Sequence, residues 1–179
     1  MTDWQKRAII GLAVLCLGNG AHVATDPVDR VVAALQRGSH TPAARSRAAT
    51  VLLATGAHAE AGTPDLATDW AHPGNAPYRN RALGPAYRLV ELDAGAEITF
   101  DQTFLAGQRA HAALVQTGER HAMHPGTGRV ELSILDETGA PQCPAGAADC
   151  SWLPLWTARY HIGVRNHGGQ RQRTFLVLQ

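Results

Sequence analysis

The strongest constraint on the fold is a change of hydrophobic period to two after Tyr87. From there to the C-terminus, short apolar runs alternate with turns rich in Gly, Asp and Asn. Alternation with period two places every second side chain on one face of a β-strand, and turns at this spacing are typical of antiparallel sandwiches. The runs lie within residues 89–92, 98–104, 113–115, 130–134, 160–164 and 174–178. The last run is apolar on both faces and is expected to be buried. The sequence therefore predicts a mainly β protein with an antiparallel β-sandwich or jelly-roll-like domain at 87–179.

Residues 1–24 have the composition of a secretory signal peptide. A basic start precedes an almost wholly apolar run over Ala8–Leu17, and small residues follow. This order is typical of export signals, and the run is too short to span a bilayer. We therefore predict a periplasmic or secreted protein whose mature chain begins near Thr25. A lipoprotein anchored at Cys16 is the weaker alternative, because Leu15 stands where lipidation needs a small residue.

Removal of the signal leaves Cys143 and Cys150 of the three cysteines in the chain. An even pair in an oxidising compartment favours a disulfide, and closing so short a loop contributes about 2–3 kcal/mol on the chain-entropy model. Two separate buried thiols are the alternative. A zinc site at this pair is disfavoured, because neither cysteine has a histidine at finger spacing.

Between the signal and the strands, the chain is first helical and then irregular in pattern. Asp26-Pro27 and Thr41-Pro42 are helix-start signals, each followed by a glycine that can end a helix. Residues 25–56 are therefore predicted to form a helical hairpin or, alternatively, a loosely ordered extension. Residues 57–86 are rich in Ala, Gly, Pro, Asp and Asn without a sustained period, which predicts a linker.

Charge and composition exclude some classes of partner. The formal net charge is +1, and the arginines are scattered along the chain. Nucleic acids and anionic membranes are bound by concentrated basic surface, so neither is expected as a partner. With 45% hydrophobic and 17% charged residues, the chain is expected to pack a core. No membrane span is expected after removal of the signal.

Three stretches of the second half share motifs with a known family. They are Phe104–Ala110, Val130–Gly139 with its D-x-x-G turn, and Cys150–Asn166, where W-x-P precedes a Y-x-I-x-V-x-N strand. In these motifs the chain resembles the bacterial pre-peptidase C-terminal-like (PPC-type) domains, small β-sandwiches found in exported proteins. The resemblance covers about half of the chain, and its motifs are mostly structural. It implies a β-sandwich and an accessory role beside a separately encoded peptidase.

The metal site that this resemblance suggests is not expected here. Many members of the family carry a D-L-D-L pattern that can present carboxylates to a cation. In this chain Arg129 and Glu131 stand at the Asp positions, and Ca²⁺ needs several oxygen ligands. His121 and His124 form a close pair without a third ligand, and Pro125-Gly126 breaks any helix that would align them. We therefore predict no metal site and no cofactor, and expect Ca²⁺ or Zn²⁺ to change the stability little.

Motifs of known enzyme classes are missing from the sequence. It contains no G-x-S-x-G, H-E-x-x-H or G-x-G-x-x-G motif and no Walker lysine. Ser133 is expected mid-strand, opposite the core-facing set, and Ser151 flanks a half-cystine. His161 and His167 are expected on the surface. No catalytic residue is predicted, and the protein is expected not to be an enzyme.

The richest aromatic cluster contains Trp152, Trp156 and Tyr160. One hypothesis makes it a stacking platform for sugar rings, with hydrogen bonds from Arg165 or Asn166. The alternative, which we favour, is an aromatic plug that packs in the core against the disulfide. Trp152, Trp156, Arg165 and Asn166 form the candidate binding surface.

These observations favour a non-enzymatic, exported β-sandwich that binds a protein or a carbohydrate of the cell envelope. A small hydrolase, or an accessory domain acting with a separately encoded peptidase, is the alternative from a different class. A purely structural envelope component is the third hypothesis.

Overall fold

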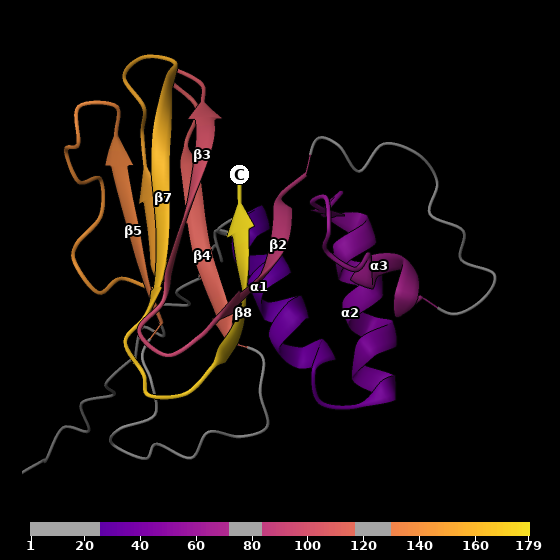
Figure 1. Cartoon of the computed structure of the whole chain (residues 1–179). Coiled ribbons are helices and arrows are strands. Elements are labelled where there is room, and N and C mark those ends of the chain that lie inside the picture. The colour runs from indigo at the N-terminus through magenta and orange to yellow at the C-terminus, as the bar shows by residue number, and fades with distance from the viewer. Residues whose placement is uncertain (1–25, 72–83, 117–129) are drawn as a thin grey trace, which may run out of the picture.

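The computed structural model describes residues 26–71, 84–116 and 130–179. Its strands and helices are β1 (His58–Ala59), β2 (Ala86–Leu92), β3 (Glu97–Phe104), β4 (Ala110–Gln116), β5 (Val130–Asp136), β6 (Asp149–Trp152), β7 (Ala158–Asn166), β8 (Gln172–Leu178), α1 (Pro27–Gly38), α2 (Pro42–Ala54) and α3 (Leu66–Asp69). One sheet has the strand order β1-β2-β8-β4-β6 and the other the order β3-β7-β5. Figure 1 shows the two sheets facing each other, with the helices against the outer face of the five-stranded sheet. The predicted mainly β, sandwich-like fold is confirmed.

The core between the sheets follows the period-two pattern of the sequence. Across β5 and β7, Leu132 pairs with Val164 and Ile134 with Ile162. These four side chains are buried and meet Leu176 from the facing sheet. Because every second residue of a strand faces the same side, the alternation read from the sequence is the alternation between core and solvent.

Strand β8 is buried on both faces, as its continuous apolar run predicts. Leu176 and Leu178 lie in the core between the sheets, whereas Phe175 and Val177 lie in a second core shared with the helices. The buried Thr174 hydroxyl donates a hydrogen bond to the Val115 carbonyl at 2.9 Å. The helical layer is therefore the reason why a central strand of an antiparallel sheet has no solvent face.

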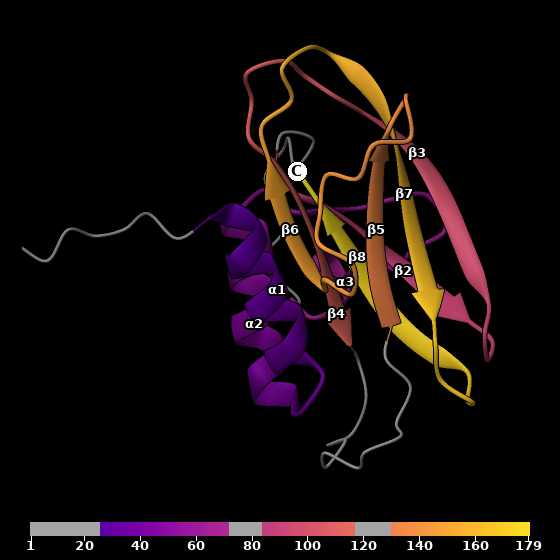
Figure 2. The same ribbon diagram turned by 90° about the vertical axis from the view of Figure 1, so that its left-hand side faces the viewer.

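Helices α1 and α2 form a hairpin that covers the outer face of the five-stranded sheet (Figure 2). Helix α1 begins at Asp26, whose carboxylate accepts a hydrogen bond from the Val28 amide at 2.8 Å. Leu35 of α1 and Leu52 of α2 are completely buried. Of the two alternatives for residues 25–56, the described residues therefore show the hairpin, and it is docked. No helix in the described ranges is long and apolar enough to cross a bilayer.

Part of the segment that the sequence predicts as a linker is folded. Strand β1 runs parallel to β2, with His58 opposite Ala86. The amide of Leu66, which begins α3, donates to the Tyr87 hydroxyl at 2.9 Å, and the Tyr87 ring is completely buried. This segment is held by single contacts and not by a repeating apolar face. Its sequence therefore shows no hydrophobic period. The linker prediction is thus corrected for residues 57–71, while residues 72–83 lie outside the described part.

The turn after β5 is held by one carboxylate, Asp136. Its Oδ1 accepts hydrogen bonds from the Thr138 hydroxyl at 2.6 Å and from the amides of Thr138 and Ala140 at 2.9 Å each. The Thr138 hydroxyl, followed by the Ala140 amide, holds the pKa of Asp136 below its usual value. Gly139 has a φ of +84°, a conformation that favours glycine. The D-x-x-G pattern therefore encodes this turn locally.

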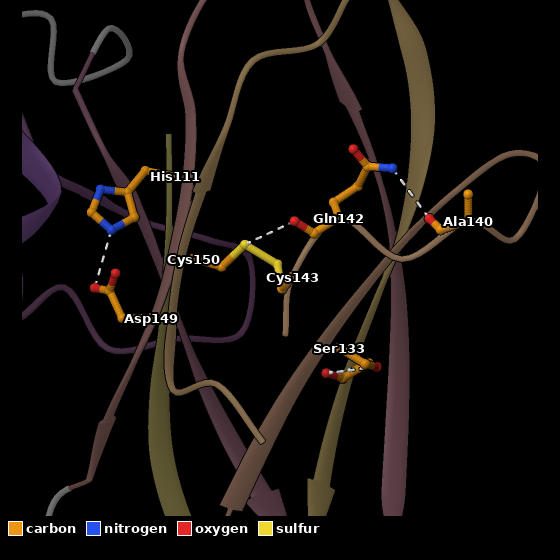
Figure 3. Close-up of a disulfide and its surroundings, with 8 residues drawn as sticks. His111, Ser133, Ala140, Gln142, Cys143, Asp149 and Cys150 are labelled. Atoms are coloured by element: carbon orange, nitrogen blue, oxygen red, sulfur yellow. Dashed lines mark hydrogen bonds and ion pairs between the residues drawn. A yellow bond between two sulfur atoms is a disulfide. The ribbon is translucent and has the colours of Figure 1, made fainter. Parts of the chain in front are cut away.

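Cys143 and Cys150 form the predicted disulfide, with their Cα atoms 5.9 Å apart. Cys150 lies in β6, a strand that the sequence pattern does not predict (Figure 3). Strand β6 pairs with β4 through only four residue pairs, from Ala110–Trp152 to Ala113–Asp149. The disulfide anchors this short edge strand to the loop that follows β5.

Removal of the disulfide is expected to lower the free energy of unfolding by about 2–3 kcal/mol, because the loop it closes is short. The change is the double substitution Cys143→Ser/Cys150→Ser, measured by urea unfolding of the mature protein. The parent protein in reductant is the matched control and should behave like the double variant. Equal urea midpoints for the oxidised parent and the double variant would show that the bond does not support the fold.

Candidate functional site

Two loops at one end of the sandwich expose large apolar side chains. The loops connect β3 to β4 and β6 to β7, and they meet at the same end of the molecule (Figure 2). The exposed fractions are 50% for Leu105, 59% for Leu153, 79% for Leu155 and 55% for Trp156. We call these four residues the apolar loop end. Single exposed apolar residues are common on proteins, but a contiguous group is typical of a binding surface.

Hydrogen bonds tie the two loops of the apolar loop end together. The Gly107 amide donates to the Pro154 carbonyl at 2.9 Å, and the Ala106 amide donates to the Thr157 hydroxyl at 3.1 Å. Gly107 has a φ of +71°, so its turn depends on glycine. The exposed side chains are therefore presented by cross-linked loops, which lowers the entropy lost when a partner binds.

Buried aromatic rings support these loops from below. Trp152 packs edge-on against Phe104, with ring centroids 4.8 Å apart, and lies 5.6 Å from Tyr160. Phe104 and Tyr160 also pack edge-on at 5.6 Å. The three rings belong to the core between the sheets. They form the base on which the apolar loop end rests.

A hollow of about 650 Å³ adjoins the apolar loop end at Leu105. Its lining includes the apolar residues Phe104, Ala110 and Leu178 together with residues that carry hydrogen-bonding side chains. The polar lining residues are His58, Glu60, Gln102, Thr103, Gln108, Arg109 and Gln179. Apolar side chains beside a polar hollow offer a partner both burial and directional contacts.

The four residues of the predicted binding surface do not lie together on the surface. Trp156 and Arg165 are exposed, but Trp152 is 9% exposed and Asn166 is completely buried. Trp152 and Asn166 are therefore corrected from binding residues to structural ones. For Trp152 and Tyr160 the favoured alternative, an aromatic plug in the core, is what the structure shows. Trp156 fits neither hypothesis. It is exposed, so it is not part of an aromatic plug, and the other two rings are buried, so it does not form an exposed platform with them.

The buried amide of Asn166 closes the end of the sandwich opposite the apolar loop end. Its Nδ2 donates to the carbonyls of Leu92 at 3.3 Å, Asp93 at 3.0 Å and Gln170 at 2.8 Å. Its Oδ1 accepts from the Gly168 amide at 2.8 Å. One side chain thus satisfies polar backbone groups of two loops, which explains its burial.

The described histidines of β7 and its following loop pair with carboxylates. His161 Nδ1 lies 2.7 Å from Asp101 Oδ1, and His167 Nε2 lies 2.8 Å from Glu131 Oε2. Both pairs are partly exposed, as predicted for these histidines. The Ser133 hydroxyl points to the Gly163 carbonyl at 3.5 Å, not to a histidine. Ser133 lines the same hollow as Glu131 and His167, but the hydrogen bond of its hydroxyl goes to a backbone carbonyl, so the described residues show no nucleophile–base pair.

Of the residues at the two metal positions considered in the sequence, the structure describes only Glu131. His121, His124 and Arg129 lie outside the described residues. Glu131 is partly buried and pairs with His167. A different group of possible ligands, built around His111, was missed by the sequence analysis because its members lie far apart in the chain.

Leu105, Leu153 and Leu155 were also missed as site residues. Their signal was present in the sequence, because Leu153-Pro154-Leu155-Trp156 places three large apolar residues around a proline, in the W-x-P segment before the next predicted strand. Apolar residues in a turn lack the alternation that would assign them to a core. Their exposure, however, is visible only in the structure.

No family model and no curated protein matches this sequence. One similar solved structure is PliG from Aeromonas hydrophila, a periplasmic lysozyme inhibitor of g-type lysozyme. The two chains share 13% sequence identity and a TM-score of 0.39, over 53% of this chain and 84% of that one. A similarity of this size gives no support for a shared function, and the PPC-type resemblance stays a prediction.

Proposed function

We propose that this protein is an exported, non-enzymatic module that binds another protein through the apolar loop end. The exposure of Leu105, Leu153, Leu155 and Trp156 on two cross-linked loops carries the proposal. Leaving such side chains in water gives no benefit to the fold, whereas a partner that covers them gains about 25 cal/mol per Å² of buried apolar surface. The disulfide and the signal-like N-terminus support export.

The chemistry of the surface favours a protein partner over a carbohydrate. Sugar-binding platforms use aromatic faces beside hydrogen-bonding groups, and the apolar loop end has one exposed ring among three leucines. Leucine side chains fit apolar pockets, and tryptophan is enriched among residues that dominate protein interfaces. Arg109 and Arg159 flank the two loops and are exposed, Arg159 with an ion pair to Asp101 at 4.0 Å, so a partner pocket with an acidic rim fits best.

The proposal is tested by placing a photo-crosslinking amino acid at position 155 of the full chain and irradiating envelope fractions of the native host. One dominant crosslinked protein is expected, identified by mass spectrometry and then purified. The same crosslinker at Arg171 is the matched control, because Arg171 is 65% exposed and lies near the opposite end of the sandwich. A protein captured equally from both positions would contradict the proposed surface.

Substitution of two residues in the apolar loop end should strongly weaken binding to the captured protein without unfolding the module. Leu155→Ser/Trp156→Ser is expected to weaken binding by at least about 30-fold, the effect of losing one interface hot spot. The free energy of unfolding should change by about 0.5 kcal/mol or less per site, because both side chains are mostly exposed. Binding is measured by titration calorimetry and stability by urea unfolding. Unchanged affinity in the double variant would overturn the proposal.

A further inference from the structure

His111 is a buried histidine surrounded by carboxylates from two other elements. It lies on β4 and is 5% exposed. Its Nε2 is 3.1 Å from Oδ2 of Asp149 on β6 (Figure 3), and its Nδ1 is 3.3 Å from Oδ2 of Asp26 at the start of α1. Asp29 in the first turn of α1 completes the group, because one carboxylate oxygen each of Asp29 and Asp149 and a ring nitrogen of His111 lie within 4.8 Å of one another.

The two ring nitrogens differ: Nε2 contacts Asp149, whereas Nδ1, which faces Asp26, has no hydrogen bond within the described residues. Asp26 Oδ2 stands at ion-pair distance from Nδ1, but among the described residues no group is aligned for a hydrogen bond with that nitrogen. The other oxygen of Asp26 is used in capping α1. A buried polar nitrogen without a hydrogen bond is costly and rare in native proteins, so it requires an explanation.

Charge gives the second reason to expect a ligand. Three carboxylates surround one imidazole, so the group is negative even when the imidazole carries a proton. A neutral imidazole has one N–H and one lone pair. With its proton on Nε2, the ring donates to Asp149 and leaves Nδ1 without a hydrogen bond; with its proton on Nδ1, the lone pair of Nε2 faces the Asp149 carboxylate.

We propose that Asp29, His111 and Asp149 bind a divalent transition-metal ion of the zinc class. The imidazole nitrogen selects such ions over Ca²⁺ and Mg²⁺, which prefer oxygen ligands alone. One ring nitrogen of His111 and the two carboxylates supply three ligands, and water completes the coordination. Asp26 acts as a positioning residue, because a metal-bound histidine usually directs its other ring N–H to a carboxylate.

The fold holds these ligands on elements that are distant in sequence. Hydrogen bonds in both directions between the backbones of His111 and Gln179, at 2.8 and 3.0 Å, fix the histidine. Asp149 precedes Cys150, so the disulfide restricts its position. The metal would therefore link the helical hairpin to the sandwich and bind only the folded chain. Its expected effect is to stabilise the docking of α1.

The test uses the full mature chain without an affinity tag, stripped with a chelator and then titrated with Zn²⁺. Calorimetry should give one tight site per chain, and saturating Zn²⁺ should raise the melting temperature by about 5 °C or more, which replaces the expectation from the sequence that Zn²⁺ changes the stability little. Co²⁺ should bind the same site and give visible absorption from a low-coordinate nitrogen–oxygen environment. No saturable Zn²⁺ binding by the parent chain would overturn the proposal.

Isosteric variants decide where the metal binds. Asp149→Asn and Asp29→Asn each remove one ligand charge at an exposed position, so they should fold and should lose the tight site and the thermal shift. Asp93→Asn, at a carboxylate that is 82% exposed elsewhere on the surface, is the matched control and should keep both. His121→Ala/His124→Ala should also keep both. A shift that survives Asp149→Asn and Asp29→Asn, or disappears in His121→Ala/His124→Ala, would place the ion elsewhere and contradict the proposal.

Discussion

Replacement of Trp152 by alanine is expected to lower the free energy of unfolding by about 3–5 kcal/mol, whereas Trp156→Ala should lower it by about 0.5 kcal/mol or less. Trp152 is 9% exposed and packs against Phe104 and Tyr160, whereas Trp156 is 55% exposed. Removing a buried indole forfeits its transfer free energy and leaves a cavity between the sheets. Urea unfolding of the two variants measures the difference.

Trp152→Phe refines this comparison. It keeps an aromatic ring in the core and removes the indole N–H, which has no hydrogen-bond partner within the described residues. Its cost should therefore be clearly smaller than that of Trp152→Ala. Similar losses for Trp152→Ala and Trp156→Ala would show that the aromatic core beneath the loops is not as described.

Leu35→Ala in α1 is expected to lower the free energy of unfolding by about 2–5 kcal/mol. Leu35 is completely buried, in the core that α1 shares with Val115 and Val177 of the five-stranded sheet. A helix of this length is marginal in water by itself, so its stability and that of the sheet face beneath it depend on each other. Helical circular dichroism and hydrogen exchange of the β8 amides should therefore report the same weakened transition.

Gln36→Ala is the matched control for this prediction. Gln36 is the next residue of α1 and is exposed, so its truncation should change the stability by about 0.5 kcal/mol or less. If the hairpin were a separate extension, Leu35→Ala would melt the helices and leave exchange in β8 unchanged. That result would contradict the shared core.

Local features of the fold are largely encoded in the sequence. The start of α1 at Asp26-Pro27 and the Asp136–Gly139 turn depend on side chains that bond to their own neighbours in the chain. The strands with period two were predicted because alternation marks one buried face. Strand β6 was missed, since it is short and proline follows it closely.

The contacts between distant segments were decided by the tertiary structure alone. A hydrophobic period shows which face of an element is apolar but not which element covers it, so the docking of the hairpin was left open. Trp152 and Trp156 have the same side-chain chemistry and lie four residues apart, yet only the first points between the sheets.

What the sequence by itself determined is the mainly β class, the disulfide and the local turns, because each is encoded in short alternating runs, within a few consecutive residues or in the parity of two cysteines, while export stays a prediction. The apolar loop end and the group around His111 were decided only by the tertiary structure. The first joins Leu105 to Trp156, and the second joins Asp29, His111 and Asp149. Such sites arise where strands and helices distant in the chain come together, and no local pattern records that distance.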